Sequence, residues 1–368
     1  MANLVLYRKY RPQTFLEVIG QDHVVQTLTN SIKNKSISHA YLFSGPRGSG
    51  KTTIARLFAK AINCQSPKNG FEPCNECSSC QEIMAGKSID LVEIDAASHT
   101  GVDDVRQLIE GIKFAPVKSK YKIFIIDECH QLSKSAANAL LKTLEEPTAH
   151  AIFLLATTES HKMIPTILSR CQKFDFKRLQ ISEIKKKLEF IANKENVKFD
   201  ESSLSLIALN SRGSFRDAES LLDECLSFSG SKSLIKAEDI EELLGMVEVS
   251  EISQFVDLLI AKNTKEAVAF LAKVMEKGVD LQEFAKTLVF YLRQELLLKI
   301  DPNFLNLQNS GLSNQELDKL KEQTASLTQK DLQNMLELFI DAENKIKYSA
   351  VPQLPLELAV INITFTEK

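Results

Sequence analysis

The chain has 368 residues and a formal net charge of −3, from 45 lysines and arginines against 48 aspartates and glutamates. Hydrophobic residues make up 44% and charged residues 25%, an ordinary globular composition that excludes a disordered, collagenous or coiled-coil protein. The length predicts two or three domains, and the slightly negative charge means that a nucleic acid must contact a local positive face.

The sequence also bears on location. No run of about 18 apolar residues occurs, so we expect no membrane-spanning helix and no membrane partner. The N-terminal stretch turns basic and polar too early for a secretory signal. The seven cysteines form an odd set, which indicates a reducing cytoplasmic location where clustered cysteines bind metal more often than they form disulfides.

Five apolar runs in the first half of the chain predict β-strands. Between them, apolar residues at helical spacing predict helices at 52–62 and 135–145, the second ending before Pro147. Strands that alternate with helices indicate a mostly parallel α/β sheet. The predicted strands are residues 40–43, 90–94, 121–126, 151–156 and 171–176.

The pattern changes near Leu179, beyond which the sequence predicts no strand. Three or four short amphipathic helices are expected as far as residue 242. The longer helices expected after them include 252–260, 264–276 and 281–299. The predicted domains are an α/β domain (1–178), a small helical domain (179–243) and a larger all-α domain (244–368).

A phosphate-binding loop is the strongest motif. Residues 45–52 read GPRGSGKT, which fits G-x-x-x-x-G-K-[ST] between a predicted strand and a predicted helix. Glycines let backbone N–H groups cradle phosphates, and the helix N-terminus favours their negative charge. Lys51 would reach the β- and γ-phosphates and the Thr52 hydroxyl would ligate Mg²⁺. A plain glycine-rich turn would not explain Lys-Thr at the helix start.

Two acids end the predicted strand 121–126. Asp127 would hold Mg²⁺ through its water shell, and Glu128 would polarise the water that attacks the nucleotide. The competing interpretation is an Asp-Glu pair that caps the next helix.

Four cysteines form a cluster with the spacing C-x₉-C-x₂-C-x₂-C among turn residues. Four thiolates close a tetrahedral Zn²⁺ site with no open position, so we favour a structural zinc knuckle over about residues 64–80. A redox-active pair is the competing interpretation. The predicted zinc ligands are Cys64, Cys74, Cys77 and Cys80. The isolated cysteines, expected to be buried small hydrophobes, are Cys129, Cys171 and Cys225.

Weaker candidates follow the strands. A hydroxyl of Thr157 or Thr158 could sense the γ-phosphate or hold the attacking water, or could simply cap the strand. Arg170 could act as an arginine finger on a neighbouring subunit, or be a solvated surface residue. Arg216 begins a helix and could fold back on the nucleotide, or pair with Asp217. The six histidines show no ligand spacing.

Together these motifs resemble the γ/τ subunits of the bacterial DNA polymerase III clamp loader, a family of AAA+ ATPases. The resemblance spans essentially the whole chain. Besides the phosphate loop and the cysteines, it rests on YRKYRP at 7–12 with Phe15, VIGQ at 18–21, DECH at 127–130, LLKTLEEP at 140–147, ATT at 156–158, SRC at 169–171, GSFRDA at 213–218 and PQLPLELA at 352–359.

The resemblance implies an α/β AAA+ P-loop NTPase domain with a zinc-knuckle insertion, then a small helical lid domain and an all-α collar domain. It implies that Thr157 or Thr158 is sensor 1, Arg216 sensor 2 and Arg170 a finger acting in trans. The residues it implies for binding ATP and Mg²⁺ are Arg11, Val18 and Ile19 at the adenine, and Gly45, Pro46, Arg47, Gly48, Ser49, Gly50, Lys51, Thr52 and Thr53 at the phosphates.

By the same resemblance the chain is an ATP-driven motor subunit that opens the β sliding clamp and loads it onto primed DNA. The implied partners are the δ and δ′ subunits and further γ/τ copies in a pentameric ring, the β clamp and primer-template DNA, at the replisome on the nucleoid. Ser98, Thr100 and Gly101 are the positions expected to face DNA phosphates. The intact phosphate loop argues against the zinc-containing δ′ subunit.

Two departures from the family pattern occur. Cys129 stands where many relatives carry an aliphatic residue, and the chain ends after the collar-like helix, as a short γ-like form or a shortened chain would. Two alternatives remain. One is a branch-migration or recombination AAA+ protein, against which the cysteine insertion and the all-helical third region argue. The other is a non-hydrolysing scaffold in which nucleotide and zinc are only structural. Intact catalytic positions argue against the scaffold.

Overall fold

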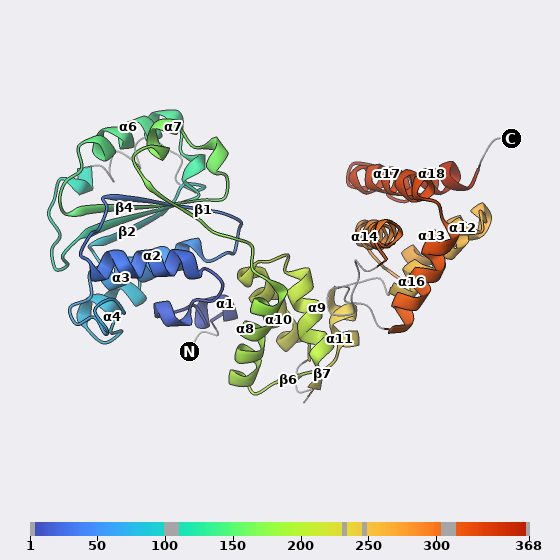
Figure 1. Cartoon of the computed structure of the whole chain (residues 1–368), viewed down its shortest axis with the longest axis horizontal. Helices are drawn as coiled ribbons and strands as arrows, with labels where there is room; N and C mark the ends of the chain where they lie inside the picture. The colour runs from blue at the N-terminus through green and yellow to red at the C-terminus, as the bar shows by residue number, and fades with distance from the viewer. Residues whose placement is uncertain (1–3, 99–109, 230–233, 245–248, 303–313, 366–368) are drawn as a thin grey trace. The chain divides into compact units, whose positions relative to one another are not determined.

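A computed structural model of the chain (Figure 1) forms two compact units, and each is described by itself. Two of the boundaries between these units fall within helices, at residues 206–207 and 224–225. They do not coincide with the limits of the three predicted domains, which therefore stay a prediction. The residues described are 4–98, 110–229, 234–244, 249–302 and 314–365. The first unit is Met1–Asn196 with Ile207–Glu224, and the second is Val197–Leu206 with Cys225–Lys368.

A five-stranded parallel sheet organises the first unit, with strand order β2-β3-β4-β1-β5. Each of the five predicted strands is confirmed to within one or two residues. Helices α2 and α3 cover one face of the sheet, and α6 and α7 cover the other (Figure 1). The strands are β1 Ala40–Ser44, β2 Leu91–Asp95, β3 Lys122–Asp127, β4 Ala151–Thr157 and β5 Gln172–Asp175.

Strand β3 shows why the apolar runs fold this way. Ile123 and Ile125 pack into the core beneath α2 and α3, whereas Phe124 packs into the opposite core beneath α6 and α7. The ring of Phe124 stacks on that of Phe153 in β4, with centroids 5.4 Å apart. A strand covered on both faces needs apolar residues at every position, which explains the continuous run.

The helices of the first unit surround this sheet. Those predicted at 52–62 and 135–145 are confirmed, and the Ser133 side chain caps α6 by accepting from the N–H of Ala136. The cap explains the abrupt start of α6. The helices are α1 Leu6–Lys9, α2 Asp22–Lys33, α3 Lys51–Ile62, α4 Ser78–Met84, α6 Lys134–Glu145, α7 Pro165–Leu168 and α8 Ile181–Lys194, with short 3₁₀ helix η1 at Phe15–Glu17.

Short helices follow α8, as predicted, but the expectation of no strand beyond Leu179 is wrong. Two-residue strands β6 Lys198–Phe199 and β7 Leu234–Ile235 pair in parallel. Two residues are too few to show an alternating pattern, so sequence periodicity cannot detect them. The helices of this stretch are α9 Glu201–Asn210, α10 Phe215–Ser229 and α11 Ala237–Leu244.

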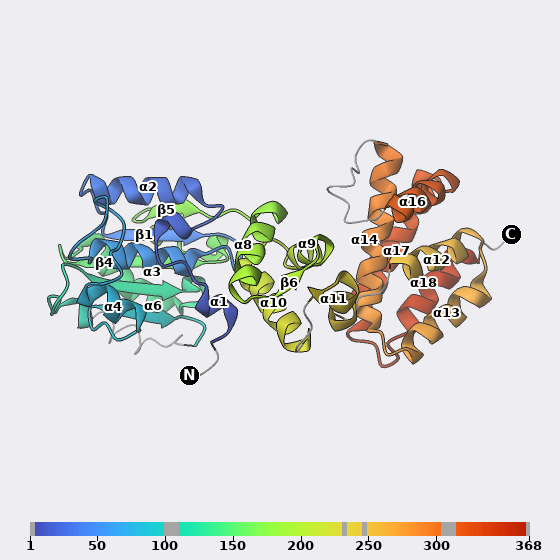
Figure 2. The ribbon, with the colours of Figure 1, turned by 90° about the horizontal axis from the view of Figure 1, so that it is seen from below.

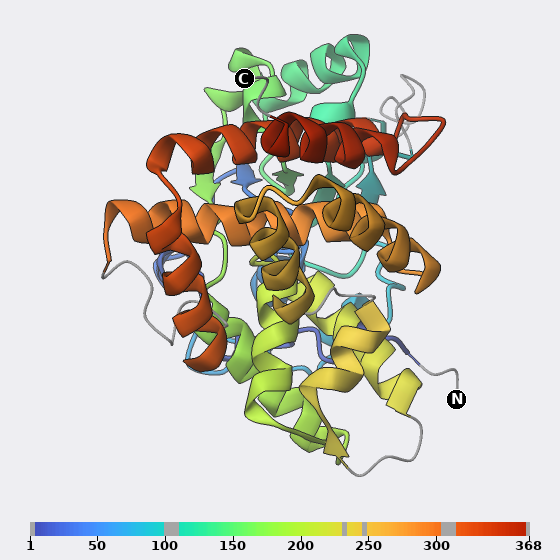
Figure 3. The same cartoon turned by 90° about the vertical axis from the view of Figure 1, so that its right-hand side faces the viewer.

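Within the described ranges, six further helices build the C-terminal part of the second unit, and the three predicted helices are confirmed. The long helix α14 packs along α17 (Figures 2 and 3). Phe255, Phe284 and Phe339 meet at the centre, with ring centroids of Phe255 and Phe284 5.3 Å apart. No helix of the described ranges is long and apolar enough to span a bilayer. The helices are α12 Val249–Ile260, α13 Thr264–Glu276, α14 Leu281–Ile300, α16 Asn314–Ser326, α17 Gln329–Ile346 and α18 Leu354–Thr364.

A buried polar network lies within this helical core. The Tyr291 hydroxyl donates to Oε1 of Gln323 at 2.5 Å, and the Gln323 amide donates to the Ser253 carbonyl at 2.8 Å and to Oδ1 of Asp257 at 2.7 Å. One turn after Tyr291, Glu295 is fully buried, and neither of its oxygens has a hydrogen-bond partner among the described residues. Burial, reinforced by Asp257, raises the pKa of Glu295 to about 8.

Replacing Glu295 by glutamine is therefore expected to change how stability depends on pH. Because the folded state raises this pKa above its ordinary value, its contribution is fully present at acidic pH and is lost as pH rises through about 8. Wild type and variant should be similarly stable near pH 5, whereas by pH 9 the variant should be more stable by a few kcal/mol. Hydrogen exchange of α14 amides in urea measures this difference; a gap that does not grow with pH contradicts it.

Candidate nucleotide-binding and metal sites

The phosphate loop connects β1 to α3 in the predicted place. Two of its glycines are required by close contacts. A Cβ at Gly45 would lie 2.5 Å from the carbonyl oxygen of Phe176, and one at Gly48 would lie 1.9 Å from Oγ of Ser214. The Gly48 carbonyl also accepts a hydrogen bond from the N–H of Phe215 at 3.2 Å. The start of α10 thus packs directly on the loop.

Lys51 and Thr52 open helix α3 at the mouth of the loop. The buried Lys51 ammonium donates to the carbonyls of Gly45 and Pro46, both at 2.8 Å. Burial lowers the pKa of Lys51, while Glu128 and Asp127 act in the opposite direction. The Thr52 hydroxyl donates to Oδ2 of Asp127 at 2.7 Å. Two oxygen atoms of the kind that Mg²⁺ prefers therefore lie together beside the loop.

Glu128 follows Asp127 in a left-handed backbone conformation, with φ of 46°. Its Oε2 accepts hydrogen bonds from the Thr158 hydroxyl at 2.9 Å and from the Thr158 N–H at 3.3 Å. His130 Nδ1 lies 3.4 Å from the same oxygen. A non-glycine residue in this conformation is uncommon, and the surrounding contacts hold its carboxylate beside the end of β4.

Thr157 makes different contacts from Thr158. Its side chain is fully buried, and its hydroxyl lies 3.0 Å from Nδ1 of His130 and accepts from the N–H of Glu159 at 3.0 Å. The sequence assigned His130 no role, although its place three residues after Asp127 in the DECH motif was a usable signal. Thr158 therefore contacts Glu128, whereas Thr157 contacts His130.

A cleft of about 590 Å³ is lined by the loop residues from Arg47 onward together with Asp127 and Glu128, whereas Gly45, Pro46, Thr157 and Thr158 are not among its lining residues. Arg216 reaches it from α10, with its guanidinium 5.1 Å from the centroid of the Tyr7 ring. No ion pair joins Arg216 to Asp217 among the described residues, so the simple pairing with Asp217 is not observed. The sequence-predicted residues that line the cleft are Arg11, Val18, Ile19, Arg47, Gly48, Ser49, Gly50, Lys51, Thr52, Thr53, Asp127, Glu128 and Arg216.

Sequence reasoning missed several lining residues. Tyr7, Lys187, Phe215 and Glu219 reach the same cleft from the N-terminal segment and from helices α8 and α10. Tyr7 and Phe215 lie in the YRKYRP and GSFRDA motifs, which were usable signals. Lys187 and Glu219 lie in no motif, and only the folding of distant segments against the loop brings them to the cleft.

Arg170 lies apart from these groups, just before β5. It is not among the described residues that line the cleft. Its guanidinium donates to Oε1 of Glu145 at 2.8 Å and to the Thr166 carbonyl at 2.7 Å. The side chain is about one-third exposed, at 32%. It is therefore held at the surface in a defined orientation.

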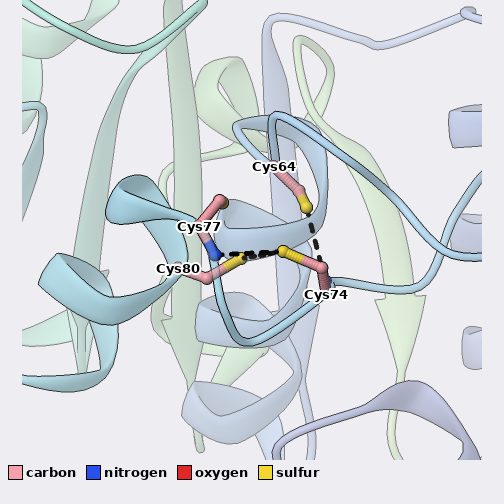
Figure 4. A group of neighbouring side chains, drawn as sticks. All are labelled: Cys64, Cys74, Cys77 and Cys80. Carbon is pink, nitrogen blue, oxygen red and sulfur yellow. Dashed lines mark hydrogen bonds between the residues drawn. The ribbon is translucent and has the colours of Figure 1, made fainter.

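The four predicted zinc ligands converge, and their sulfur atoms all lie within 4.8 Å of one another (Figure 4). All four are free thiols. The sulfurs of Cys74 and Cys80 are 3.9 Å apart, close to the roughly 3.8 Å that tetrahedral zinc at about 2.3 Å from each sulfur requires. The N–H groups of Cys77 and Glu76 donate to the Cys74 sulfur and lower its pKa to about 6. This donor set fits zinc.

The cysteine knuckle also supports the N-terminal segment that lines the cleft. Glu72 is 3% exposed, and its carboxylate accepts from the N–H groups of Phe15 at 2.9 Å and Leu16 at 3.0 Å. On α3, the buried Lys60 ammonium donates to the side chain of Gln13 at 3.0 Å. The knuckle is thus attached to the residues that lead into Val18.

We expect purified protein to contain about one zinc ion per chain, held by the four cysteines. Cys77→Ser should lose most of this metal to a mild chelator and disturb the local fold more than nucleotide binding, since no zinc ligand contacts the phosphate loop. Metal analysis and thiol titration measure both. Cys171→Ser, at an isolated cysteine, is the control and should keep its zinc; a metal-free wild type or a Cys64–Cys74 disulfide contradicts the assignment.

Three family models match the chain in succession. The model described as DNA polymerase III, delta subunit, matches residues 20–180. The clamp loader subunit ATPase lid domain matches 183–231, and domain III of subunits gamma and tau matches 235–368. Their order follows the fold, from the parallel sheet to the C-terminal helices.

Two solved structures are similar over much of the chain. The RuvB Holliday junction branch migration motor of Thermotoga maritima has a TM-score of 0.48 and 18% identity, covering 68% of this chain and 79% of that one. The DNA clamp loader delta protein of Bacillus subtilis has a TM-score of 0.39 and 14% identity, covering 92% and 99%. Both TM-scores lie below 0.5, so family membership rests on sequence.

Curated relatives match along the whole chain. The tau subunit of DNA polymerase III is 42% identical in Bacillus subtilis and 35% in Escherichia coli, covering 100% and 98% of this chain. The chain spans only 64% and 55% of those two proteins. The gamma subunit of Buchnera aphidicola from Acyrthosiphon pisum is 34% identical, and the match covers 98% of both chains. With the phosphate loop, the Thr52–Asp127 pair and the four cysteines in place, the chain belongs to the γ/τ subunit family of DNA polymerase III.

Proposed function

We propose that the chain is an ATP-driven motor subunit of the DNA polymerase III clamp loader, which opens the β sliding clamp and loads it onto primed DNA. The observation that carries the proposal is one cleft that combines the phosphate loop, the Thr52–Asp127 pair and Glu128. Membership of the γ/τ family supports the biological setting.

Within this cleft, the backbone N–H groups of residues 47–52 and the N-terminus of α3 bind the triphosphate. Lys51 exchanges its two carbonyl acceptors for the β- and γ-phosphates. Thr52 and Asp127 would hold Mg²⁺, which neutralises the charge that develops on the phosphates. Arg11, Val18 and Ile19 enclose the base, so that the nucleotide extends from the loop to the N-terminal segment.

Glu128 orients and polarises the attacking water in this proposal. Thr158 holds its carboxylate at 2.9 Å and is the better candidate for sensor 1, because a displacement of Thr158 changes the position of Glu128 directly. Thr157 acts one step further away, through His130. Arg216, at the start of α10, serves as sensor 2 and couples the phosphates to the lid.

Assembly supplies the remaining groups. Arg170 would complete the site of a neighbouring subunit in a pentameric ring of γ/τ copies with δ and δ′, acting on the β clamp and primer-template DNA at the cytoplasmic replisome. Zinc would be structural. Of the positions expected to face DNA phosphates, Thr100 and Gly101 lie outside the described residues. Ser98 is exposed, and its hydroxyl donates to Oδ2 of Asp95 at 3.3 Å.

Steady-state ATPase measurements test this function. The isolated chain should turn over slowly, because the finger comes from another subunit, and primed DNA with clamp, δ and δ′ should stimulate it. A branch-migration protein would respond to four-way junctions without the clamp. A scaffold would bind nucleotide without hydrolysing it under any condition. Either result would overturn the proposal.

A further inference from the structure

One carboxylate in the cleft has no role in this chemistry. Glu219 lies on α10, three residues after Arg216, and is 6% exposed. It lines the cleft, yet within the described ranges its carboxylate makes no hydrogen bond or ion pair. Buried polar groups normally have partners, so an unpaired one that faces a cleft indicates that the partner arrives with a ligand.

Glu219 lines the same cleft as the phosphate loop, but different charged groups act on it. The charges that act on its carboxyl are Lys187 and Arg11, whereas those that act on Lys51 are Glu128 and Asp127. The Lys187 ammonium in turn donates to the Tyr10 carbonyl at 3.0 Å, beside Arg11. With the phosphates of a nucleotide at the loop and its base between Val18 and Ile19, as proposed above, the nucleoside would lie on the side of Arg11 and Lys187.

We propose that Glu219 accepts a hydrogen bond from the exocyclic 6-amino group of adenine and thereby selects ATP over GTP. The inference rests on the nucleotide-binding function proposed above. An ionised carboxylate only accepts hydrogen bonds. Adenine presents an amino donor at this position, whereas guanine presents a carbonyl oxygen that a carboxylate repels. Specificity thus has both an attractive and a repulsive element.

The base is a better partner than the ribose. Both carry donors, but the apolar side chains of Val18 and Ile19 line the same cleft and suit a flat aromatic ring. Burial of Glu219 to 6% exposure also fits a partner that excludes water, because a dry carboxylate discriminates more strongly between a donor and an acceptor.

Protonation provides a signature of this contact. Burial raises the pKa of Glu219 to about 7, while Lys187 and Arg11 act in the opposite direction. Above this pH the carboxylate repels the guanine carbonyl; below it the neutral acid can donate to that carbonyl, so discrimination falls. The other charged groups that line the cleft are Arg8, Arg11 and Glu17 on the N-terminal segment, Arg47 in the phosphate loop, Lys51 and Arg56 on α3, Asp127 and Glu128 at the end of β3, Lys187 on α8 and Arg216 on α10.

The test displaces a fluorescent ADP analogue from the full 368-residue chain with ATP or GTP between pH 6 and 8.5. Wild type should prefer ATP by about 10- to 100-fold at the alkaline end and by less at the acid end. Glu219→Gln can accept or donate, so its ATP-to-GTP ratio should be close to one at every pH. Glu219→Leu should also lose the preference, by weakening ATP. Glu224→Gln, at an exposed acid on the same helix, is the matched control.

Distinct outcomes overturn the two proposals. If both Glu219 variants keep the wild-type ratio and its pH dependence, Glu219 does not read the base. If 2′-deoxy-ATP, and not GTP, separates wild type from the variants, the carboxylate faces the ribose and the inference is wrong. A folded wild type that binds neither ATP nor GTP instead overturns the nucleotide-binding function itself.

Discussion

In an assembled complex, Arg170→Ala is expected to cut DNA-stimulated ATP hydrolysis by about 10³- to 10⁵-fold, the range that arginine fingers show in GTPases. The reason is its placement. Arg170 is held at the surface by Glu145 and the Thr166 carbonyl and is not among the described residues lining the chain's own cleft. The isolated chain should therefore keep nearly unchanged affinity for ATP, which nucleotide titration measures.

Mixed complexes separate an effect in trans from a general charge effect. One subunit carries Lys51→Ala and its neighbour carries Arg170→Ala, in either order around the ring. If the Arg170 variant faces the site that already lacks Lys51, a single site is disabled. In the other order two different sites are disabled, so the residual ATPase activity should differ. Equal losses in both orders would show that Arg170 does not act across the interface. Lys173→Ala, at an exposed cation on β5, is the control and should retain activity.

Lys51→Ala is expected to abolish clamp loading while the chain stays folded. Lys51 is the buried cation at the loop, and its loss removes the charge that contacts the β- and γ-phosphates. Glu128→Gln should behave differently, binding ATP and opening the clamp but hydrolysing about 10²- to 10⁴-fold more slowly. Fluorescent nucleotide titration, a clamp-opening assay and phosphate release measure the three steps.

The contrast between the two variants is the informative result. If both lose nucleotide binding to the same extent, Lys51 and Glu128 do not have separate roles. Lys87→Ala and Glu189→Gln remove charges of the same sign at exposed positions and should leave all three steps intact. A melting curve that matches wild type distinguishes lost contacts from lost folding.

Much of the fold could be predicted because the central strands of the sheet, β1, β3 and β4, are buried on both faces. β3 and β4 are apolar at almost every position, and this continuity identified them without knowledge of their partners. The β6–β7 pair could not be predicted, since two residues carry no period. Helix α4 begins at the end of the cysteine knuckle and has seven residues, too few to give a clear helical period in the sequence.

The candidate site divides in the same way. The phosphate loop, Asp127 and the cysteines follow local spacings that chemistry constrains, and these could be recognised in the sequence. The roles of Glu219 and Glu72 could not be recognised, because each depends on contact with a segment more than fifty residues away in the sequence. Glu219 reads as an ordinary helical acid, and only burial beside the cleft distinguishes it.

If zinc and nucleotide bind as proposed, the attachment of the knuckle to the N-terminal segment would couple the binding of one to the binding of the other. Glu72 holds the amides of Phe15 and Leu16, and the chain then continues into Val18 and Ile19 at the cleft. A metal ion that orders the knuckle would also order one wall of the proposed base pocket. By thermodynamic reciprocity, the factor by which zinc tightens ATP binding equals the factor by which ATP tightens zinc binding. The γ/τ chain would then release its metal more slowly when nucleotide is bound, so ATP would protect a structural ion that it never touches.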